Sequence, residues 1–88
     1  MYYVYVLKST KSDYIYIGSS DDLKRRFIEH NALKSESTKP YAPFKLMYYE
    51  AYADKKDALS REYGLKHHGS AVGHLKKRLR YSFQKGGA

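Results

Sequence analysis

The stretch from Tyr14 to Asn31, YIYIGSSDDLKRRFIEHN, constrains the fold of this chain more than any other part. Tyrosine and isoleucine alternate at its start, as in a β-strand with one buried face. We expect Gly18 to end that strand, and the serines and aspartates that follow are typical of the start of a helix. Leu23 and Phe27, four residues apart, would face the sheet. The stretch therefore predicts a strand followed directly by a helix.

The rest of the chain supplies two more strands and two more helices. Aromatic and β-branched residues at 2–7 (YYVYVL) and 44–52 (FKLMYYEAY) are typical of strands. A polar loop at 9–13 joins the first of them to the next strand, which predicts an antiparallel hairpin. The predicted elements are strands at 2–7 and 14–17, a helix at about 21–33, a loop at 34–43, a strand at 44–52, a helix from Asp54 to about His67 and a helix that begins at Ser70. This order, ββαβαα, predicts an α+β fold with a small three-stranded antiparallel or mixed sheet flanked by helices.

Alternation and helical spacing also predict which side chains share a face. In the third strand, Leu46, Tyr48 and Glu50 would lie on one face of the sheet. Asp54 is a suitable N-cap for the second helix, and Gly69 would end that helix. The last helix carries an apolar stripe made of Val72, Leu75, Leu79 and Phe83.

The length and composition of the chain suit one small domain. It has 88 residues, of which 42% are hydrophobic, as is typical of a globular protein. We expect a single domain over residues 1–84 and a frayed tail over 85–88. The chain has no cysteine, no apolar run long enough to span a membrane, and no basic segment with a cleavage site at its start. We therefore expect a cytoplasmic protein with no membrane partner.

The chain is strongly basic. Its 17 lysines and arginines against nine acidic residues give a formal charge of +8. On so small a domain this charge, interleaved with aromatic residues, predicts an anionic partner, of which nucleic acid is the commonest. The candidate contacts are Lys24, Arg25, Lys34, Lys39, Lys76, Lys77, Arg78 and Arg80. For the cluster at 76–80, an ordinary solvated helix face explains the charges equally well.

Two polar residues of the first predicted helix stand one turn apart. Arg26 and His30 lie beside the stripe formed by Leu23 and Phe27, which would aim them at the rim of the sheet. A guanidinium can bond two phosphate oxygens and neutralise charge that develops during hydrolysis. A histidine can share a proton or bind a phosphate, or it can be an ordinary residue of a helix surface.

Glu62 is the second helix's most informative residue. It falls among the apolar residues Ala58, Leu59 and Leu65 on a helical wheel. A carboxylate on an apolar stripe is unfavourable unless a cation or hydrogen-bond donors satisfy it. Two partners would do so, and the sequence leaves both open: a hard divalent ion such as Mg²⁺ or Mn²⁺, or the side chain of a lysine or arginine.

The strands and the first helix together carry a family resemblance. The triplets YVY at 3–5 and YIG at 16–18, then LKRR at 23–26 and His30, are similar to the motifs of the GIY-YIG nuclease superfamily. The chain looks closest to the small stand-alone bacterial members, which are related to the catalytic domain of the excinuclease of nucleotide excision repair. The second block, YIGSSDDLKRRFIEHN, is the specific part of this resemblance.

The resemblance implies an endonuclease that hydrolyses phosphodiester bonds in DNA with one divalent ion, Mg²⁺ or Mn²⁺. It implies catalytic roles for Tyr5, Tyr16, Arg26 and His30, and a metal-binding role for Glu62. Either tyrosine would act as general base or would position water and phosphate. A free phenol, with a pKa of about 10, needs a nearby cation to act as a base near neutrality.

Two positions depart from the family pattern, and the sequence leaves other functions open. Tyr3 stands where the first triplet of the family has glycine, and the late polar residue of some members, often asparagine, has no counterpart that we can place. One alternative is a nucleic-acid-binding module of the same fold with weak or no catalysis. Another is a protein-interaction adaptor, which would expose a large apolar patch. The substrate could be branched, damaged or single-stranded DNA, with a role in DNA repair or processing, or RNA.

Overall fold

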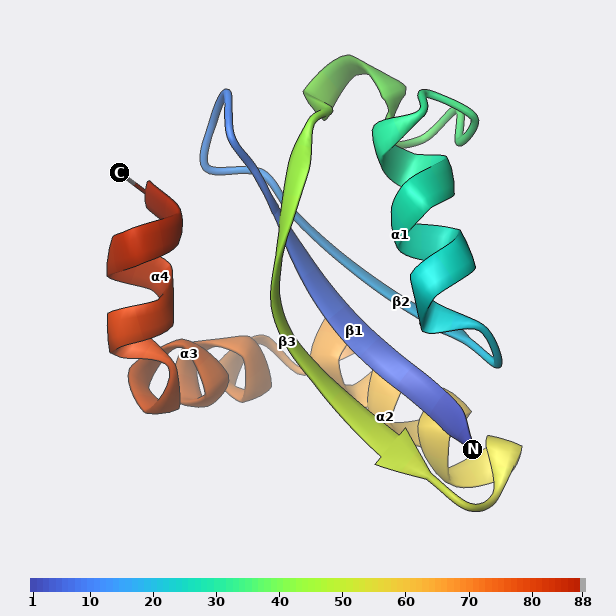
Figure 1. The fold of residues 1–88 in the computed structure, drawn as a ribbon. Coiled ribbons are helices and arrows are strands. Elements are labelled where there is room, and N and C mark those ends of the chain that lie inside the picture. The colour runs from blue at the N-terminus through green and yellow to red at the C-terminus, as the bar shows by residue number, and fades with distance from the viewer. Residues whose placement is uncertain (88) are drawn as a thin grey trace.

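The strand β1 (Tyr2–Ser9) lies at the centre of the fold and pairs with a strand on each side. The structure, a computed structural model, describes residues 1–87. β1 pairs antiparallel with β2 (Ile15–Ser20) and β3 (Phe44–Tyr52), so the strand order is β2-β1-β3. The helices are α1 (Leu23–Asn31), the short 3₁₀ helix η1 (Lys39–Tyr41), α2 (Lys55–His67), α3 (Gly69–Arg78) and α4 (Arg80–Gly87) (Figure 1). The predicted α+β class is confirmed.

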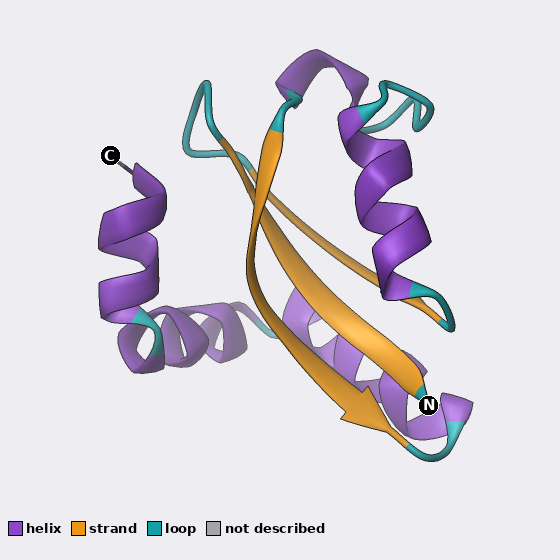
Figure 2. Cartoon of the chain, in the orientation of Figure 1, coloured by secondary structure: helices purple, strands orange, loops and turns teal. Residues whose placement is uncertain are grey.

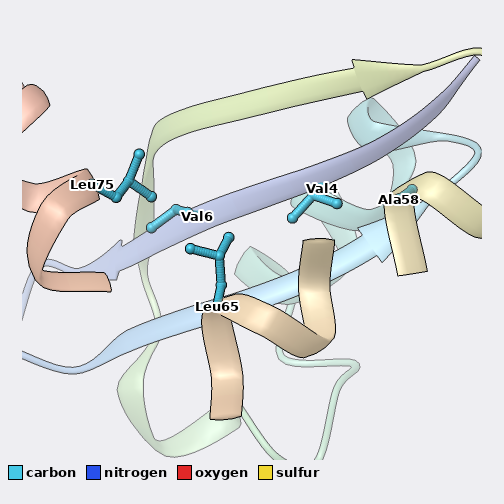
Figure 3. Packing of buried hydrophobic residues seen from close by; sticks show 5 residues of the cluster. All are labelled: Val4, Val6, Ala58, Leu65 and Leu75. Atoms are coloured by element: carbon cyan, nitrogen blue, oxygen red, sulfur yellow. The ribbon is translucent and has the colours of Figure 1, made fainter. Parts of the chain in front are cut away.

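The sheet is covered by helices on both faces, as Figure 2 shows. Val4 and Val6 of β1 point to one face and pack with Ala58 and Leu65 of α2 and Leu75 of α3 (Figure 3). On the opposite face, Tyr5 and Leu7 pack with Ala42, Phe44 and the apolar side of α1. Residues 4–7 of β1 are at most 2% exposed, because this central strand is enclosed from both sides. None of the helices in the described part of the chain is long and apolar enough to cross a membrane.

The first helix begins later than predicted, because the preceding strand is longer. β2 continues through Gly18 to Ser20, so the prediction that Gly18 ends the strand is wrong. Register explains the difference: Gly18 lies opposite Tyr5, and Ser20 lies opposite Tyr3, so β1 provides pairing partners beyond the glycine. Asp22, whose side chain accepts a hydrogen bond from the backbone N–H of Arg25, is the N-cap of α1.

The third strand has the predicted bounds but not the predicted faces. Val6 pairs with Tyr48 whereas Leu7 pairs with Leu46, which leaves Met47 as an extra residue in a bulge. Leu46 and Tyr48 therefore lie on opposite faces of the sheet, and the prediction that they share a face is wrong. Tyr48 and Glu50 do share the face of α2, where the Tyr48 hydroxyl donates to Glu50 at 2.8 Å.

The last predicted helix is divided into two. α3 ends at Arg78 and α4 begins at Arg80, with Leu79 as the C-cap between them. The break turns α4 back toward β3 (Figure 1), so Leu79 and Phe83 both reach the core that Val72 and Leu75 contact. The apolar stripe is thus confirmed although the single helix is not. The frayed tail over 85–88 stays a prediction: α4 is described to Gly87, and Ala88 lies outside the described residues.

A partly buried carboxylate network fixes α2 against β3. The Nε and Nη2 atoms of Arg61 donate to Glu50 at 3.0 and 3.1 Å, and the hydroxyls of Tyr48 and Tyr52 donate to the same carboxylate. Burial raises the pKa of Glu50, but the hydrogen bonds from Arg61 and the two tyrosines outweigh it, so the net shift is downward. The predicted N-cap Asp54 is confirmed, since its side chain accepts a hydrogen bond from the backbone N–H of Lys56. The cap and the Glu50 network together set the position of Glu62, which follows Arg61 on α2.

Gly18 supports a specific stability prediction. A Cβ atom there would lie 2.6 Å from the Tyr5 hydroxyl oxygen and 2.8 Å from the Cε2 of Tyr16. Because Tyr5 is buried and cannot yield easily, Gly18→Ala should lower the free energy of unfolding by about 1–3 kcal/mol. Urea denaturation measures this change.

The matched control is Gly73→Ala on α3, where a Cβ would meet nothing within 4 Å. That change should raise stability by up to about 1 kcal/mol, because alanine is the better helix former. Equal effects of the two substitutions would contradict the proposed close contact at Gly18.

Candidate active site

The four predicted catalytic residues lie on the α1 face of the sheet, which they share with the side of β2 that carries Tyr16. Tyr5 comes from β1, Tyr16 from β2, and Arg26 and His30 from α1. The ring of His30 lies 4.7 Å from the ring of Tyr16 and 5.9 Å from that of Tyr5, and the two tyrosine rings are 6.2 Å apart. Gly18, across from Tyr5 in the register, leaves the space that these rings occupy.

His30 is a core residue and not part of the helix surface. Its side chain is fully buried, with Nε2 3.1 Å from the Tyr5 hydroxyl and Nδ1 2.8 Å from the Thr38 hydroxyl. A neutral imidazole has one donor and one acceptor nitrogen, and two hydroxyls can satisfy both. Burial lowers the pKa of His30, and the positive charge of Arg26 lowers it further. The geometry and the pKa shift both favour a neutral ring.

Tyr5 is buried and remains protonated over a wide pH range. Burial and the nearby Tyr16 raise the pKa of its hydroxyl to about 12, and the adjacent Arg26 only partly offsets them. A phenol with such a pKa is a poor base near neutrality. Tyr16, by contrast, lies on the edge strand and is only half-buried. Of the two tyrosines, Tyr16 has the better access to a substrate.

Arg26 faces the site but already has an anionic neighbour. Its Nη1 donates to Oε1 of Glu29 at 2.6 Å, one turn further along α1. Both side chains are about one third exposed, at 31% and 30%. A guanidinium carries five N–H donors, so the contact with Glu29 leaves donors free for a phosphate.

Glu62 lies on the opposite face of the sheet, packed against the same edge strand. Ser19 of β2 donates to its Oε1 at 2.6 Å, and Nζ of Lys66 donates to its Oε2 at 2.7 Å. The Glu62 side chain is 18% exposed. Only two of the three apolar residues predicted around Glu62 are buried: Ala58 and Leu65 are buried, but Leu59 is 42% exposed. The lysine pairing that the sequence left open is therefore present in the structure.

The two halves of the site are connected around the edge of β2. Tyr16 and Ser19 point to opposite faces of this strand, toward α1 and α2 respectively, as the register requires. Lys66 links the halves, since its Nζ lies 5.9 Å from the centre of the Tyr16 ring as well as beside Glu62. A phosphate at this edge would face Arg26 from one side and Glu62 with Lys66 from the other.

The ligands that the protein offers at this edge suit one hard divalent ion that takes most of its ligands from water and substrate. No group of three or more histidine, cysteine, aspartate or glutamate side chains within residues 1–87 is placed to hold a metal. Mg²⁺ often keeps several waters and binds one carboxylate together with substrate phosphates. Glu62 fits that pattern once Oε2 is released from Lys66.

The predicted nucleic-acid contacts are distributed around the molecule. Lys24, Lys34 and Lys39 are exposed on or after α1, and Arg25 lies 3.8 and 3.9 Å from the carboxylates of Asp21 and Asp22. The remaining four, Lys76, Lys77, Arg78 and Arg80, are also exposed. They lie on α3 and α4, and α4 packs on β3, the edge strand opposite β2. Arg80, at the start of α4, therefore lies on the β3 side of the sheet, away from the candidate active site, whereas the other three lie on α3, which contacts α2.

An apolar groove of about 450 Å³ occupies the other flank of α1. Tyr3, Leu46 and Tyr49 line it from the sheet, and the aspartates at the start of α1 lie at its border. The predicted catalytic residues are not among its lining. The negative charges there disfavour a phosphate, so we place the candidate site at the β2 edge.

Sequence reasoning missed three residues that support the site. Lys66 follows Glu62 by four positions and could have been identified as a helical ion pair. Ser19 could have been identified only if β2 had been expected to continue past Gly18. No sequence pattern indicates the role of Thr38, because it contacts His30 from the loop at 34–43.

Comparison with known proteins identifies the family of this chain. Residues 1–77 match the family model described as the GIY-YIG catalytic domain. A UPF0213 protein of Lacticaseibacillus paracasei is 45% identical over 67 residues, which cover 75% of this chain and 74% of that protein. A UPF0213 protein of Lactiplantibacillus plantarum is 38% identical over 74 residues, or 81% of this chain and 72% of the relative.

A third UPF0213 protein, from Limosilactobacillus reuteri, is 41% identical over 69 residues, which cover 75% of this chain and 71% of the relative. No solved structure matches the chain significantly. The family model spans both tyrosine triplets, α1 and Glu62, and so confirms the resemblance that the motifs carry. The chain belongs to the GIY-YIG family of nuclease domains.

Proposed function

We propose that this protein is a divalent-metal-dependent endonuclease that hydrolyses phosphodiester bonds in DNA. The observation that carries the proposal is that Tyr16 and Glu62 approach the edge strand β2 from opposite faces of the sheet, with Arg26 beside Tyr5 on the Tyr16 face. A guanidinium, a carboxylate and a phenol at one edge provide a phosphate ligand, a metal ligand and a proton carrier. The formal charge of +8 favours a polyanionic substrate.

Each residue has a distinct role in the proposed reaction. The oxygen of a water molecule attacks the phosphorus while the bond to the leaving oxygen breaks, and negative charge grows on the phosphate oxygens. Arg26 donates to those oxygens and stabilises the charge. Glu62 would hold one Mg²⁺ or Mn²⁺, which as a Lewis acid would polarise a phosphate oxygen. Tyr16, the more accessible of the two tyrosines, is our candidate general base: as the phenolate it would take the proton of the attacking water, and the leaving oxygen would take up a proton from the solvent.

Tyr5 and His30 are proposed to position these groups. Tyr5 is buried, its pKa is raised to about 12, and its hydroxyl contacts His30. His30 in turn contacts Thr38 and is enclosed by aromatic rings. The hydrogen bonds from Thr38 through His30 to Tyr5 therefore fix the buried side chains next to Arg26 and Tyr16. A role for His30 in direct proton transfer to substrate would need the site to open.

The exposed lysines and arginines near α1 are proposed to hold the substrate outside the site. Lys24, Lys34 and Lys39 are exposed on the same side of the sheet as Arg26.

Branched, damaged and single-stranded DNA are the proposed substrate forms, in repair or processing, and RNA is the competing nucleic acid. One observation favours a binding module without catalysis: Arg26 and Glu62 both have charged partners, Glu29 and Lys66, in the free protein.

Cleavage assays with matched variants test the proposal. End-labelled single-stranded, duplex and branched DNA, and an RNA, are incubated with the protein in Mg²⁺ or Mn²⁺. We expect cleavage by the wild type, loss of it in EDTA, and a fall in rate of about 100-fold or more in Arg26→Ala and Glu62→Ala, because each removes charge stabilisation at the phosphate.

Arg25→Ala is the control, since it removes the same charge from the neighbouring, mostly exposed position of α1. It should weaken binding slightly and leave the cleavage step intact. Equal cleavage by all variants would indicate a contaminating nuclease and contradict the proposal. Salt-sensitive binding without any cleavage would favour the binding module instead.

The buried state of His30 makes a pH prediction. Its pKa is lowered by burial first and by Arg26 second, so the folded protein resists protonation that the unfolded chain accepts. Stability should therefore be complete above the ordinary histidine pKa of about 6.5 and should decline as the pH falls below it, toward the lower pKa of the folded state.

NMR titration of the imidazole protons measures the pKa of His30 directly, and urea unfolding at pH 7.5 and 5.5 measures the stability change. His30→Gln should reduce the stability lost between these two pH values, whereas His67→Gln, at an exposed site on α2, should not. A titration midpoint of His30 at or above 6.5 would refute the neutral buried ring.

A further inference from the structure

We infer that Lys66 is a substrate-binding residue that exchanges partners: it pairs with Glu62 in the free protein and binds a phosphate of the nucleic acid when a divalent ion takes Glu62. The inference rests on the proposed function, because it assumes an ion at Glu62 and a phosphate at the β2 edge. It adds a residue that neither the family resemblance nor the sequence reasoning assigned to the site.

The position of Lys66 satisfies both halves of this role. Its Nζ lies 2.7 Å from Oε2 of Glu62, the oxygen that Ser19 leaves unoccupied. The same Nζ is 5.9 Å from the centre of the Tyr16 ring, so it lies close to the β2 edge where the phosphate is proposed to bind. Among the ion pairs of the described residues, Glu62 is its only anionic partner.

The exposures of the two partners indicate which one moves. Glu62 is held by Ser19 and is 18% exposed, whereas Lys66 is 40% exposed and sits on a flexible four-carbon stem. A partly exposed ion pair of this kind contributes little to stability, so it can open without unfolding the helix. The carboxylate would therefore stay in place while the ammonium turns away.

The exchange predicts that the ion and the nucleic acid bind cooperatively. A divalent ion that binds alone must displace Lys66 and leave its ammonium without an anion. When a phosphate is present, the released ammonium gains a new partner, and the ion completes its coordination with phosphate oxygens. By linkage, each ligand then raises the affinity of the other by the same factor.

The test measures Mn²⁺ binding and needs no turnover. Titration calorimetry and Mn²⁺ electron paramagnetic resonance give the affinity of wild type, Lys66→Met and Glu62→Gln, with and without a short nuclease-resistant phosphorothioate oligonucleotide. We expect Lys66→Met to bind Mn²⁺ several-fold more tightly than wild type in the absence of the oligonucleotide. The increase in Mn²⁺ affinity caused by the oligonucleotide should be smaller in Lys66→Met than in wild type.

Lys56→Met is the matched control, because it removes the same charge from an exposed position on the first turn of the same helix. It should change the affinity for Mn²⁺ much less than Lys66→Met does. Methionine retains most of the length and apolar contact of the lysine stem, and circular dichroism checks that each variant is folded.

The outcomes separate this inference from the proposed function. If Glu62→Gln abolishes Mn²⁺ binding but Lys66→Met leaves the affinity unchanged, the exchange by Lys66 is wrong and the metal role of Glu62 stands. If Glu62→Gln leaves Mn²⁺ binding unchanged, the metal role of Glu62 falls and the inference falls with it. Equal effects of Lys66→Met and Lys56→Met would show general charge repulsion and would overturn the exchange.

Discussion

The contact between the Tyr5 hydroxyl and Nε2 of His30, at 3.1 Å, joins the central strand to α1 and sets the geometry of the site. Both side chains are fully enclosed, so the pair cannot exchange its partners for water without opening the core. The residues around it are fixed in turn: Gly18 must lack a side chain, and Thr38 must bring its loop over His30. This contact, together with the two hydrogen bonds between the Asn31 side chain and the backbone of Phe44, holds α1 in place and so positions Arg26, one turn before His30 on the same helix.

An edge strand is usually a liability, because its unpaired backbone groups can recruit another chain. Here β2 is short, and side chains of opposite charge and aromatic rings crowd it from both faces. The same arrangement makes the edge useful: a ligand can contact α1 residues and α2 residues at once, which no position in the middle of the sheet allows. The network of Glu50 with Arg61 and two tyrosines supports this by anchoring α2 one residue away from Glu62.

The parts of the fold that were predicted correctly depend on local chemistry. The bounds of β3, the N-cap Asp54 and the apolar stripe of the last helices follow from alternation, capping and helical spacing. The errors depend on contacts between distant residues: the pairing of Ser20 with Tyr3 extends β2, the bulge at Met47 reverses the face of Leu46, and the break at Leu79 turns α4 toward the sheet. For the candidate site, spacing and the motifs predicted roles for Arg26, His30 and Glu62, and these roles stay predictions. The burial of His30 and the contacts from Thr38 and Ser19 required the tertiary structure.

In the free protein, the charged residues of the candidate site are already paired with neighbouring charges. Arg26 is paired with Glu29, and Glu62 is paired with Lys66, each within one turn of its own helix. In the proposed site, Lys66 holds the carboxylate oxygen that a divalent ion would take, and Glu29 holds one of the five donors of Arg26, so each ligand would bind beside an existing ion pair. A chain with a formal charge of +8 attracts any polyanion, and a site that required only one of the two ligands would be open to many of them. In the proposed reaction, a requirement for both ligands at one strand edge would restrict the reactive arrangement to a metal-bound phosphodiester, and the two ion pairs would then be part of the selectivity of the site.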